Sequence, residues 1–145
     1  MKKVLVIGGG MAGSIVANGL ARKLSKELNN GTVEITVLSA TDKHLYQPGL
    51  LYLTFGRVTE SELIRDQRGI LDNRIKFYVD PATNIDTDTK KVTTKSGKVF
   101  ECDYMVIATG SRLVPENVPG LSEGAHNFYS IEGAKKLRDT LKTFE

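Results

Sequence analysis

Val4-Leu5-Val6-Ile7-Gly8-Gly9-Gly10-Met11-Ala12-Gly13 is the stretch of sequence that decides the fold. Its first four residues form a short apolar run that stops at glycine, a pattern typical of a strand covered on both faces in a parallel sheet. The residues that follow fit the spacing G-x-G-x-x-G. Placed between a strand and a helix, this spacing predicts a pyrophosphate site, because the amides and the dipole of a helix N-terminus attract negative charge.

The residues after the glycines predict a helix and a second strand. Over residues 11–28, apolar side chains recur at a helical period with charged residues between them. Asn29-Asn30-Gly31 is expected to end this helix, since Asn and Gly tolerate the left-handed conformation of a helix stop. A strand over residues 33–38 then completes a strand-helix-strand crossover, which indicates an α/β fold with parallel strands.

Residues 39–59 are dense in apolar side chains but interrupted by Pro48, Gly49 and Gly56. We expect a loop there that packs on the protein body or on a bound ring system. The further elements expected along the chain are a short helix over 61–71, a strand over 75–79, a hairpin formed by 91–94 and 98–101, a strand over 104–108, a loop over 115–120 and an amphipathic helix over 131–144.

The composition is that of one ordinary globular domain: 145 residues, of which 40% are hydrophobic and 26% are charged. Twenty Lys and Arg are scattered among seventeen Asp and Glu, so no nucleic acid partner is expected. No apolar run approaches the roughly 20 residues that span a bilayer, and the start does not resemble a signal peptide, so a cytoplasmic location is expected. The single cysteine, Cys102, excludes an intramolecular disulfide framework and a cysteine-built metal site.

Each residue of the glycine turn (residues 8–13) has an expected role. Gly8 permits the tight turn, and Gly10 lets the backbone approach a pyrophosphate. Gly13 lets the helix pack closely on the strand, while Met11 and Ala12 supply amides at the same phosphate site. The alternative is a glycine-rich turn that binds no ligand.

The end of the second strand carries Ser39, where a dinucleotide site normally presents an Asp or Glu to ribose hydroxyls. The nearest acid is Asp42. A hydroxyl can also bond a ribose hydroxyl, although as a neutral and weaker acceptor. We therefore expect Ser39 at the adenosine ribose, and the missing carboxylate argues mildly against a standard NAD site.

Two later segments resemble those of a group of flavoenzymes. The meander that leads into Tyr104-Met105-Val106-Ile107-Ala108-Thr109-Gly110 resembles the second signature of flavoproteins with two dinucleotide-binding domains. His44-Leu45-Tyr46-Gln47-Pro48-Gly49-Leu50-Leu51-Tyr52-Leu53-Thr54-Phe55-Gly56 resembles the segment after the second strand in sulfide:quinone oxidoreductases, flavocytochrome c sulfide dehydrogenases and type II NADH dehydrogenases. The resemblance covers nearly the whole chain.

This resemblance implies a Rossmann-like doubly wound parallel sheet with an inserted antiparallel β-meander, and FAD as the cofactor. It places Pro48 beside the flavin, Thr109 and Gly110 near the phosphate-ribityl region, and the backbone of Ala82, between strands, at adenine. Residues 1–145 would be the amino-terminal part of an FAD-binding domain. Later segments would complete the site, so this chain alone is expected to bind FAD weakly and to be inactive.

Ser39 favours one branch of the group, because type II NADH dehydrogenases generally carry an acid there and sulfide:quinone oxidoreductases resemble this chain in having serine. That branch implies electron transfer from sulfide to quinone, with a membrane surface reached only through segments absent from this chain. No catalytic residue and no metal ligand is assigned; Cys102 is expected to be structural, and His44 either packs or faces the flavin or quinone. The alternatives are a type II NADH:quinone oxidoreductase and a non-enzymatic nucleotide-sensing Rossmann domain, and the oligomeric state is left open.

Overall fold

The computed structural model describes residues 1–143 and contains two compact units. The first unit consists of Met1–His44 and Asp66–Gly110, and it holds the parallel sheet. The second unit consists of Leu45–Arg65 and the chain from Ser111 onward, and it is mainly helical. The first unit has two buried apolar clusters and the second unit has one.

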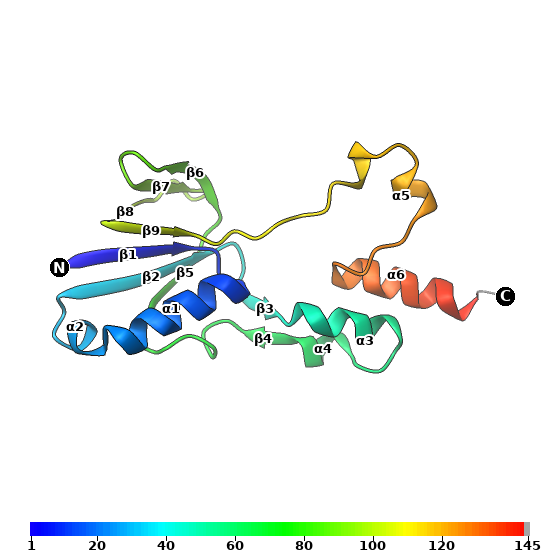
Figure 1. Ribbon diagram of the computed structural model, residues 1–145, viewed down its shortest axis with the longest axis horizontal. Coiled ribbons are helices and arrows are strands. Elements are labelled where there is room, and N and C mark those ends of the chain that lie inside the picture. Colours follow the sequence, from blue (N-terminus) through cyan, green and yellow to red (C-terminus); the bar gives the residue numbers. More distant parts are fainter. Residues whose placement is uncertain (144–145) are drawn as a thin grey trace. The chain divides into compact units, whose positions relative to one another are not determined.

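A four-stranded parallel sheet forms the centre of the first unit (Figure 1). The strands are arranged in the order β5-β2-β1-β9, so that β9 is one edge of the sheet. Since β1 lies between β2 and β9, the direction of chain progression reverses at β1, and a ligand crevice is expected outside the carboxyl end of this strand. The strand bounds are Lys2–Ile7 for β1, Val33–Ser39 for β2, Lys76–Val79 for β5 and Tyr104–Ile107 for β9.

Both faces of the sheet are covered, as the continuous apolar run in β1 predicts (Figure 1). Val4 and Val6 point to helix α1 (Met11–Lys23), where they join a cluster with Ala17. Leu5 and Ile7 point the other way and pack with the antiparallel meander. The predicted α/β class, with its parallel sheet and inserted meander, is confirmed.

The meander consists of β6 (Ala82–Asp86), β7 (Lys91–Thr94) and β8 (Val99–Glu101). The predicted hairpin corresponds to β7 and β8, whereas β6 has no clear alternating pattern in the sequence. Ala82 does not lie between strands, as we expected, but is the first residue of β6 and pairs with Thr94.

The first helix is shorter than the sequence predicts. It ends at Lys23. The next residue, Leu24, has a backbone that is not helical (φ −103°, ψ 28°), and a short helix α2 (Ser25–Asn29) follows. At this break, the Arg74 guanidinium donates to the carbonyl oxygen of Ala21 at 3.3 Å and to Ser25 Oγ at 2.7 Å. A distant side chain thus supplies hydrogen bonds that helical periodicity cannot reveal.

The second unit is built on four buried residues, Leu50, Leu53, Leu63 and Ala134. The apolar segment expected to be a loop contains a helix, and the helix expected over 61–71 is wrong beyond residue 63, where a strand paired with residues 43–45 begins. The final helix, predicted over residues 131–144, ends at Lys142 in the structure. The last residue of the predicted helix, Phe144, lies outside the described residues. The remaining elements are β3 (Lys43–Leu45), η1 (Gln47–Gly49), α3 (Leu50–Thr54), α4 (Glu60–Leu63), β4 (Ile64–Asp66), η2 (Pro115–Asn117), α5 (Leu121–Gly124) and α6 (Ile131–Lys142).

Within residues 1–143, no helix has the length and apolar character needed to cross a membrane.

Asp72 and Arg74 form the ion pair whose protonation we expect to affect stability at acid pH. Arg74 donates from Nε to Asp72 Oδ1 at 2.9 Å and from Nη2 to Oδ2 at 2.7 Å. These hydrogen bonds lower the pKa of Asp72 to about 2. Because the pKa is lower in the folded than in the unfolded state, the pair stabilises the fold above about pH 4 and this contribution is lost as the pH falls through about 2.

We therefore expect Asp72→Asn to lower the melting temperature at pH 7 and to have a much smaller effect at pH 2, measured by thermal unfolding across this range. Glu116→Gln, at an exposed position, is the control and should have the same small effect at both pH values. An equal loss for Asp72→Asn at both pH values would contradict the assignment.

Candidate functional site

The glycine turn leaves β1 at Gly8 in a conformation that only glycine adopts easily, with φ of +110°. A Cβ atom on Gly8 would overlap the carbonyl oxygen of Ala108, at the end of β9. The Gly8 N–H donates to the carbonyl oxygen of Leu38 in β2 at 2.7 Å. The turn is therefore held against the carboxyl ends of both strands that flank β1.

Gly13 and Gly10 have opposite surroundings. A Cβ atom on Gly13, in the first turn of α1, would overlap the carbonyl oxygen of Gly8, so this glycine allows the helix to lie directly on the turn. A Cβ atom on Gly10 would meet no atom within 4 Å, and the φ of Gly10 is an ordinary −69°. Glycine is therefore required at position 13 by the packing of the protein itself, whereas at position 10 it leaves open space beside the backbone.

The amides at the start of α1 are free donors. Within residues 1–143, the N–H groups of Gly10, Met11 and Ala12 have no hydrogen-bond acceptor in the protein. The first turn of α1 contains no acidic residue that would compete for its positive end. An anion such as the diphosphate of FAD fits this arrangement of free donors, and Gly10 provides the room for its approach.

Ser39, Thr109 and Gly110 lie around the same turn. The Ser39 side chain is buried, and a Cβ atom on Gly9 would lie only 2.7 Å from Ser39 Oγ. Thr109 and Gly110 are exposed directly after β9, and the Thr109 nitrogen lies 3.1 Å from the position of a Cβ on Gly8. The structure thus brings these predicted residues together at the carboxyl ends of the parallel strands.

Ala82 reaches these strand ends through the segment that follows β5. The Asp80 N–H donates to the carbonyl oxygen of Ser39 at 2.8 Å, which holds the segment beside the end of β2. The Ala82 side chain packs against the apolar cluster of Leu5, Ile7 and Leu38. Only its backbone is therefore available for a ligand, and its contact with adenine stays a prediction.

Pro48 belongs to the second unit, where it is exposed in η1. The next residue, Gly49, is buried, and a Cβ there would overlap the Leu63 side chain. The expected place of Pro48 beside the flavin stays a prediction.

Tyr129, also in the second unit, forms a hydrogen bond with Ser111: its Oη lies 3.0 Å from Ser111 Oγ. This hydrogen bond is the main cause that lowers the pKa of Tyr129.

Sequence reasoning missed Gln67, which is completely buried under the glycine turn. Its side chain contacts Ser14 and His44, and both of these bond the carbonyl oxygen of Gly9. His44 therefore packs against the turn. Gln67 stands between charged residues, with no apolar pattern that would have predicted its burial.

Cys102 has the environment of a structural thiol. Burial is the main cause that raises its pKa, which disfavours the nucleophilic thiolate. Its Sγ donates a weak hydrogen bond to the carbonyl oxygen of Lys90 at 3.5 Å.

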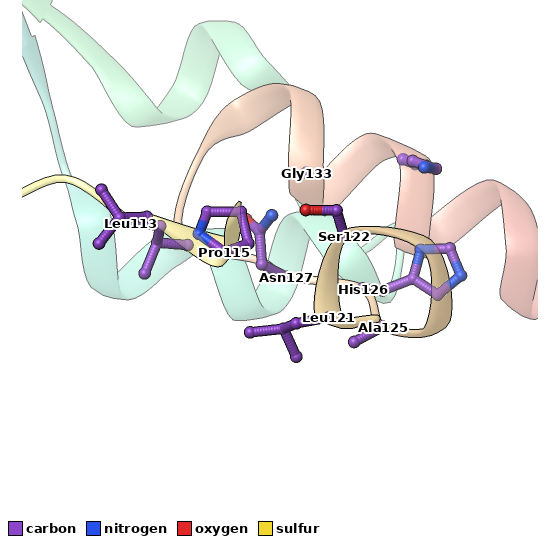
Figure 2. A pocket seen from close by; sticks show the side chains of 10 residues that line it. Leu113, Pro115, Leu121, Ser122, Ala125, His126, Asn127 and Gly133 are labelled. Carbon is purple, nitrogen blue, oxygen red and sulfur yellow. The ribbon is translucent and has the colours of Figure 1, made fainter. Parts of the chain in front are cut away.

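Both units contain cavities. One cavity in the first unit has a volume of about 610 Å³ and is lined by residues that include Met11, Ser14 and His44. One cavity in the second unit measures about 440 Å³ and is lined mainly by apolar side chains such as Leu113, Pro115 and Leu121 (Figure 2). None of the predicted cofactor residues lines the cavity of about 440 Å³.

The glycine turn lies at the reversal point of a parallel sheet and has free amides at the start of a helix. This arrangement defines a dinucleotide-binding α/β protein. The chain belongs to the pyridine nucleotide-disulphide oxidoreductase family, whose model matches residues 2–143. This family consists of FAD-binding oxidoreductases, so the cofactor expected from the resemblance is confirmed at the level of the family.

Proteins similar to this chain include two kinds of quinone reductase. A mitochondrial sulfide:quinone oxidoreductase of Dictyostelium discoideum is 28% identical over 148 aligned residues, which cover 99% of this chain and 32% of that protein. A type II NADH:quinone oxidoreductase of Staphylococcus haemolyticus is 31% identical over 137 residues, which cover 94% of this chain and 33% of that protein.

The solved structure of the sulfide:quinone oxidoreductase from Aquifex aeolicus is also similar, with a TM-score of 0.83 and 29% identity over 99% of this chain and 32% of that one. The chain therefore spans about a third of the length of the relatives it matches. The expected resemblance to sulfide:quinone oxidoreductases is confirmed.

Alanine substitutions in the glycine turn should separate packing from ligand space. Gly13→Ala should lower the free energy of unfolding by about 1–3 kcal/mol, because the new methyl group overlaps the Gly8 carbonyl oxygen. Gly10→Ala should change it by no more than about 1 kcal/mol, since its methyl group meets nothing. Urea unfolding of both variants checks this, and equal losses would show that the turn does not have the packing described.

Proposed function

We propose that residues 1–145 are the amino-terminal part of an FAD-binding domain and that the glycine turn holds the FAD diphosphate. The observation that carries this proposal is the set of free amides at the start of α1, together with the open space beside the Gly10 backbone. Gly10, Met11 and Ala12 donate to the diphosphate, while Gly8 and Gly13 keep the turn against the sheet. Membership of an FAD-binding family supports this assignment.

Most of the remaining contacts are supported by residues that gather at the carboxyl ends of the strands. Ser39 lies at the adenosine ribose and the Ala82 backbone at adenine. Thr109 and Gly110 flank the phosphate-ribityl region, since the chain that leaves β9 passes Gly8 at Ala108 and Thr109. The resemblance alone supports the place of Pro48 against the flavin. Segments outside this chain complete the site, which leaves this chain with weak affinity for FAD.

For the complete protein we propose oxidation of sulfide with quinone as electron acceptor. FAD, when bound, accepts two electrons from the donor and passes them on. Ser39 supports this branch, because the resemblance gives type II NADH dehydrogenases an acid at the end of the second strand, whereas sulfide:quinone oxidoreductases resemble this chain in having serine there. The similarity to the Aquifex aeolicus structure supports it further. Reduction of quinone would take place at the inner face of the cell membrane, through segments outside this chain.

The alternative function is oxidation of NADH with quinone as acceptor. It is favoured by one observation, the 31% identity to a type II NADH:quinone oxidoreductase. Both functions use the same FAD site in this chain, so they differ only in the electron donor.

Gly10→Ala should weaken binding of FAD and of ADP by about tenfold or more, equivalent to roughly 1.4 kcal/mol, because its methyl group fills the space of the diphosphate. Isothermal titration of the 145-residue chain measures this. The matched control is Gly19→Ala, a second position in α1 where a Cβ meets nothing within 4 Å. It should leave both affinities unchanged. Unaltered affinity in Gly10→Ala would contradict the assignment of the diphosphate to this turn.

The electron donor is tested on the complete protein loaded with FAD under anaerobic conditions. Sulfide should bleach the flavin absorbance and NADH should not, because Ser39 favours the sulfide:quinone branch, in which sulfide is the electron donor. Stopped-flow spectroscopy records both reactions. Bleaching by NADH alone would establish the alternative function.

A further inference from the structure

The carbonyl oxygen of Gly9, in the middle of the glycine turn, accepts two hydrogen bonds from inside the protein. Ser14 Oγ donates to it at 3.1 Å, and His44 Nδ1 lies 3.3 Å from it. Ser14 is buried in the first turns of α1, and His44 comes from β3. The Gly9 peptide is therefore fixed by side chains from two separate elements of the first unit.

Gln67 determines the direction of these hydrogen bonds. Its Nε2 donates to Ser14 Oγ at 2.8 Å, and its Oε1 lies 3.0 Å from His44 Nδ1. Because Ser14 Oγ accepts from the amide, its own hydrogen is free for the Gly9 oxygen. His44 Nδ1 faces two acceptor oxygens and so carries a hydrogen. The amide thus leaves the Ser14 hydroxyl hydrogen for Gly9, and its own oxygen shares the single Nδ1 hydrogen of His44 with the Gly9 oxygen.

The geometry of the Gly9–Gly10 peptide links the hydrogen bonds of the Gly9 oxygen to the direction of the Gly10 N–H. The described residues contain no cis peptide bond, and in a planar trans peptide the C=O of one residue points opposite to the N–H of the next. With the Gly9 oxygen held toward Ser14 and His44, the Gly10 N–H points away from these side chains. Within the described residues no acceptor takes this N–H. Two successive glycines would otherwise rotate easily, and a flipped peptide would present its oxygen to an anion.

Gln67 itself has no freedom to rearrange. Its side chain is fully buried, and within residues 1–143 no buried side-chain polar atom lacks a hydrogen-bond partner. A buried amide whose nitrogen and oxygen both have partners favours one arrangement of its neighbours, since another arrangement can leave an unpaired polar group.

We propose that Gln67 is a positioning residue for diphosphate recognition, acting through Ser14 and His44 on the Gly9–Gly10 peptide. This inference rests on the proposed function of the glycine turn and assigns part of its affinity to a side chain that does not touch the ligand. The group recognised is the diphosphate of the dinucleotide, not its adenosine.

A purely structural role for Gln67 can be separated from this one by a neighbouring residue. Asn18, also in α1, donates from Nδ2 to the carbonyl oxygen of Ile70 at 3.0 Å and accepts from the Asp72 N–H at 2.8 Å. It ties the same 66–72 segment to the same helix but makes no hydrogen bond to Gly9. Asn18→Ala is therefore the matched control.

The experiment compares Gln67→Met, which keeps the length of the side chain without its amide, with Asn18→Ala. The probes are FAD, ADP and adenosine, and affinities for the 145-residue chain are measured by ligand-observed NMR and titration. Gln67→Met should weaken FAD and ADP binding by about tenfold and leave adenosine binding unchanged, because only the diphosphate meets the Gly10 amide. Asn18→Ala should lower the melting temperature without this difference between ADP and adenosine.

A second readout needs no ligand. The backbone amide resonances of Gly9 and Gly10 should move in Gln67→Met and in Ser14→Ala, and should stay in place in Asn18→Ala. Ser14→Ala removes one of the two donors to Gly9 and serves as the test if Gln67→Met does not fold.

The outcomes distinguish the two proposals. If the unmodified chain binds neither FAD nor ADP, the proposed function fails and this inference with it. If the unmodified chain binds ADP, but Gln67→Met and Ser14→Ala bind it equally well or lose ADP and adenosine alike, the role of Gln67 is overturned and the diphosphate site remains.

Discussion

The close approach of backbone to backbone at Gly8 and Gly13 is the constraint on which the rest of the first unit depends. Any side chain at either position would occupy space held by a carbonyl oxygen, of Ala108 in one case and of Gly8 in the other. Strand, turn and helix can therefore meet only where both residues are glycine. That meeting directs the amides before α1 outward at the reversal point of the sheet.

Much of the fold follows from local sequence because the relevant signals are steric. The apolar run before the glycines predicts a strand covered on two faces, and alternate residues of β1 do pack on α1 and on the meander. The errors arise where distant partners decide the conformation. Arg74 supplies hydrogen bonds at the break after α1, and pairing with residues 43–45 extends the chain after Leu63. Neither partner is visible in a periodic pattern.

The sequence predicts the candidate site to about the same extent as it predicts the fold. The glycines, Ser39 and the residues after β9 do gather at one edge of the sheet, because parallel strands bring their carboxyl ends together. Gln67 was not predictable, since a single amide between charged neighbours looks like surface. The resemblance shows the family and its cofactor, whereas the electron donor depends on contacts beyond the third of the relatives' length that this chain spans.

The position of β9 at one edge of the sheet has a practical consequence. Within the described residues its only strand partner is β1, and its side chains Tyr104 and Ile107 are exposed. An unpaired edge with apolar side chains can act as a template for a strand from another molecule. Self-association through this edge would increase with protein concentration, so dilute samples of the isolated chain are the ones in which its monomeric behaviour can be studied.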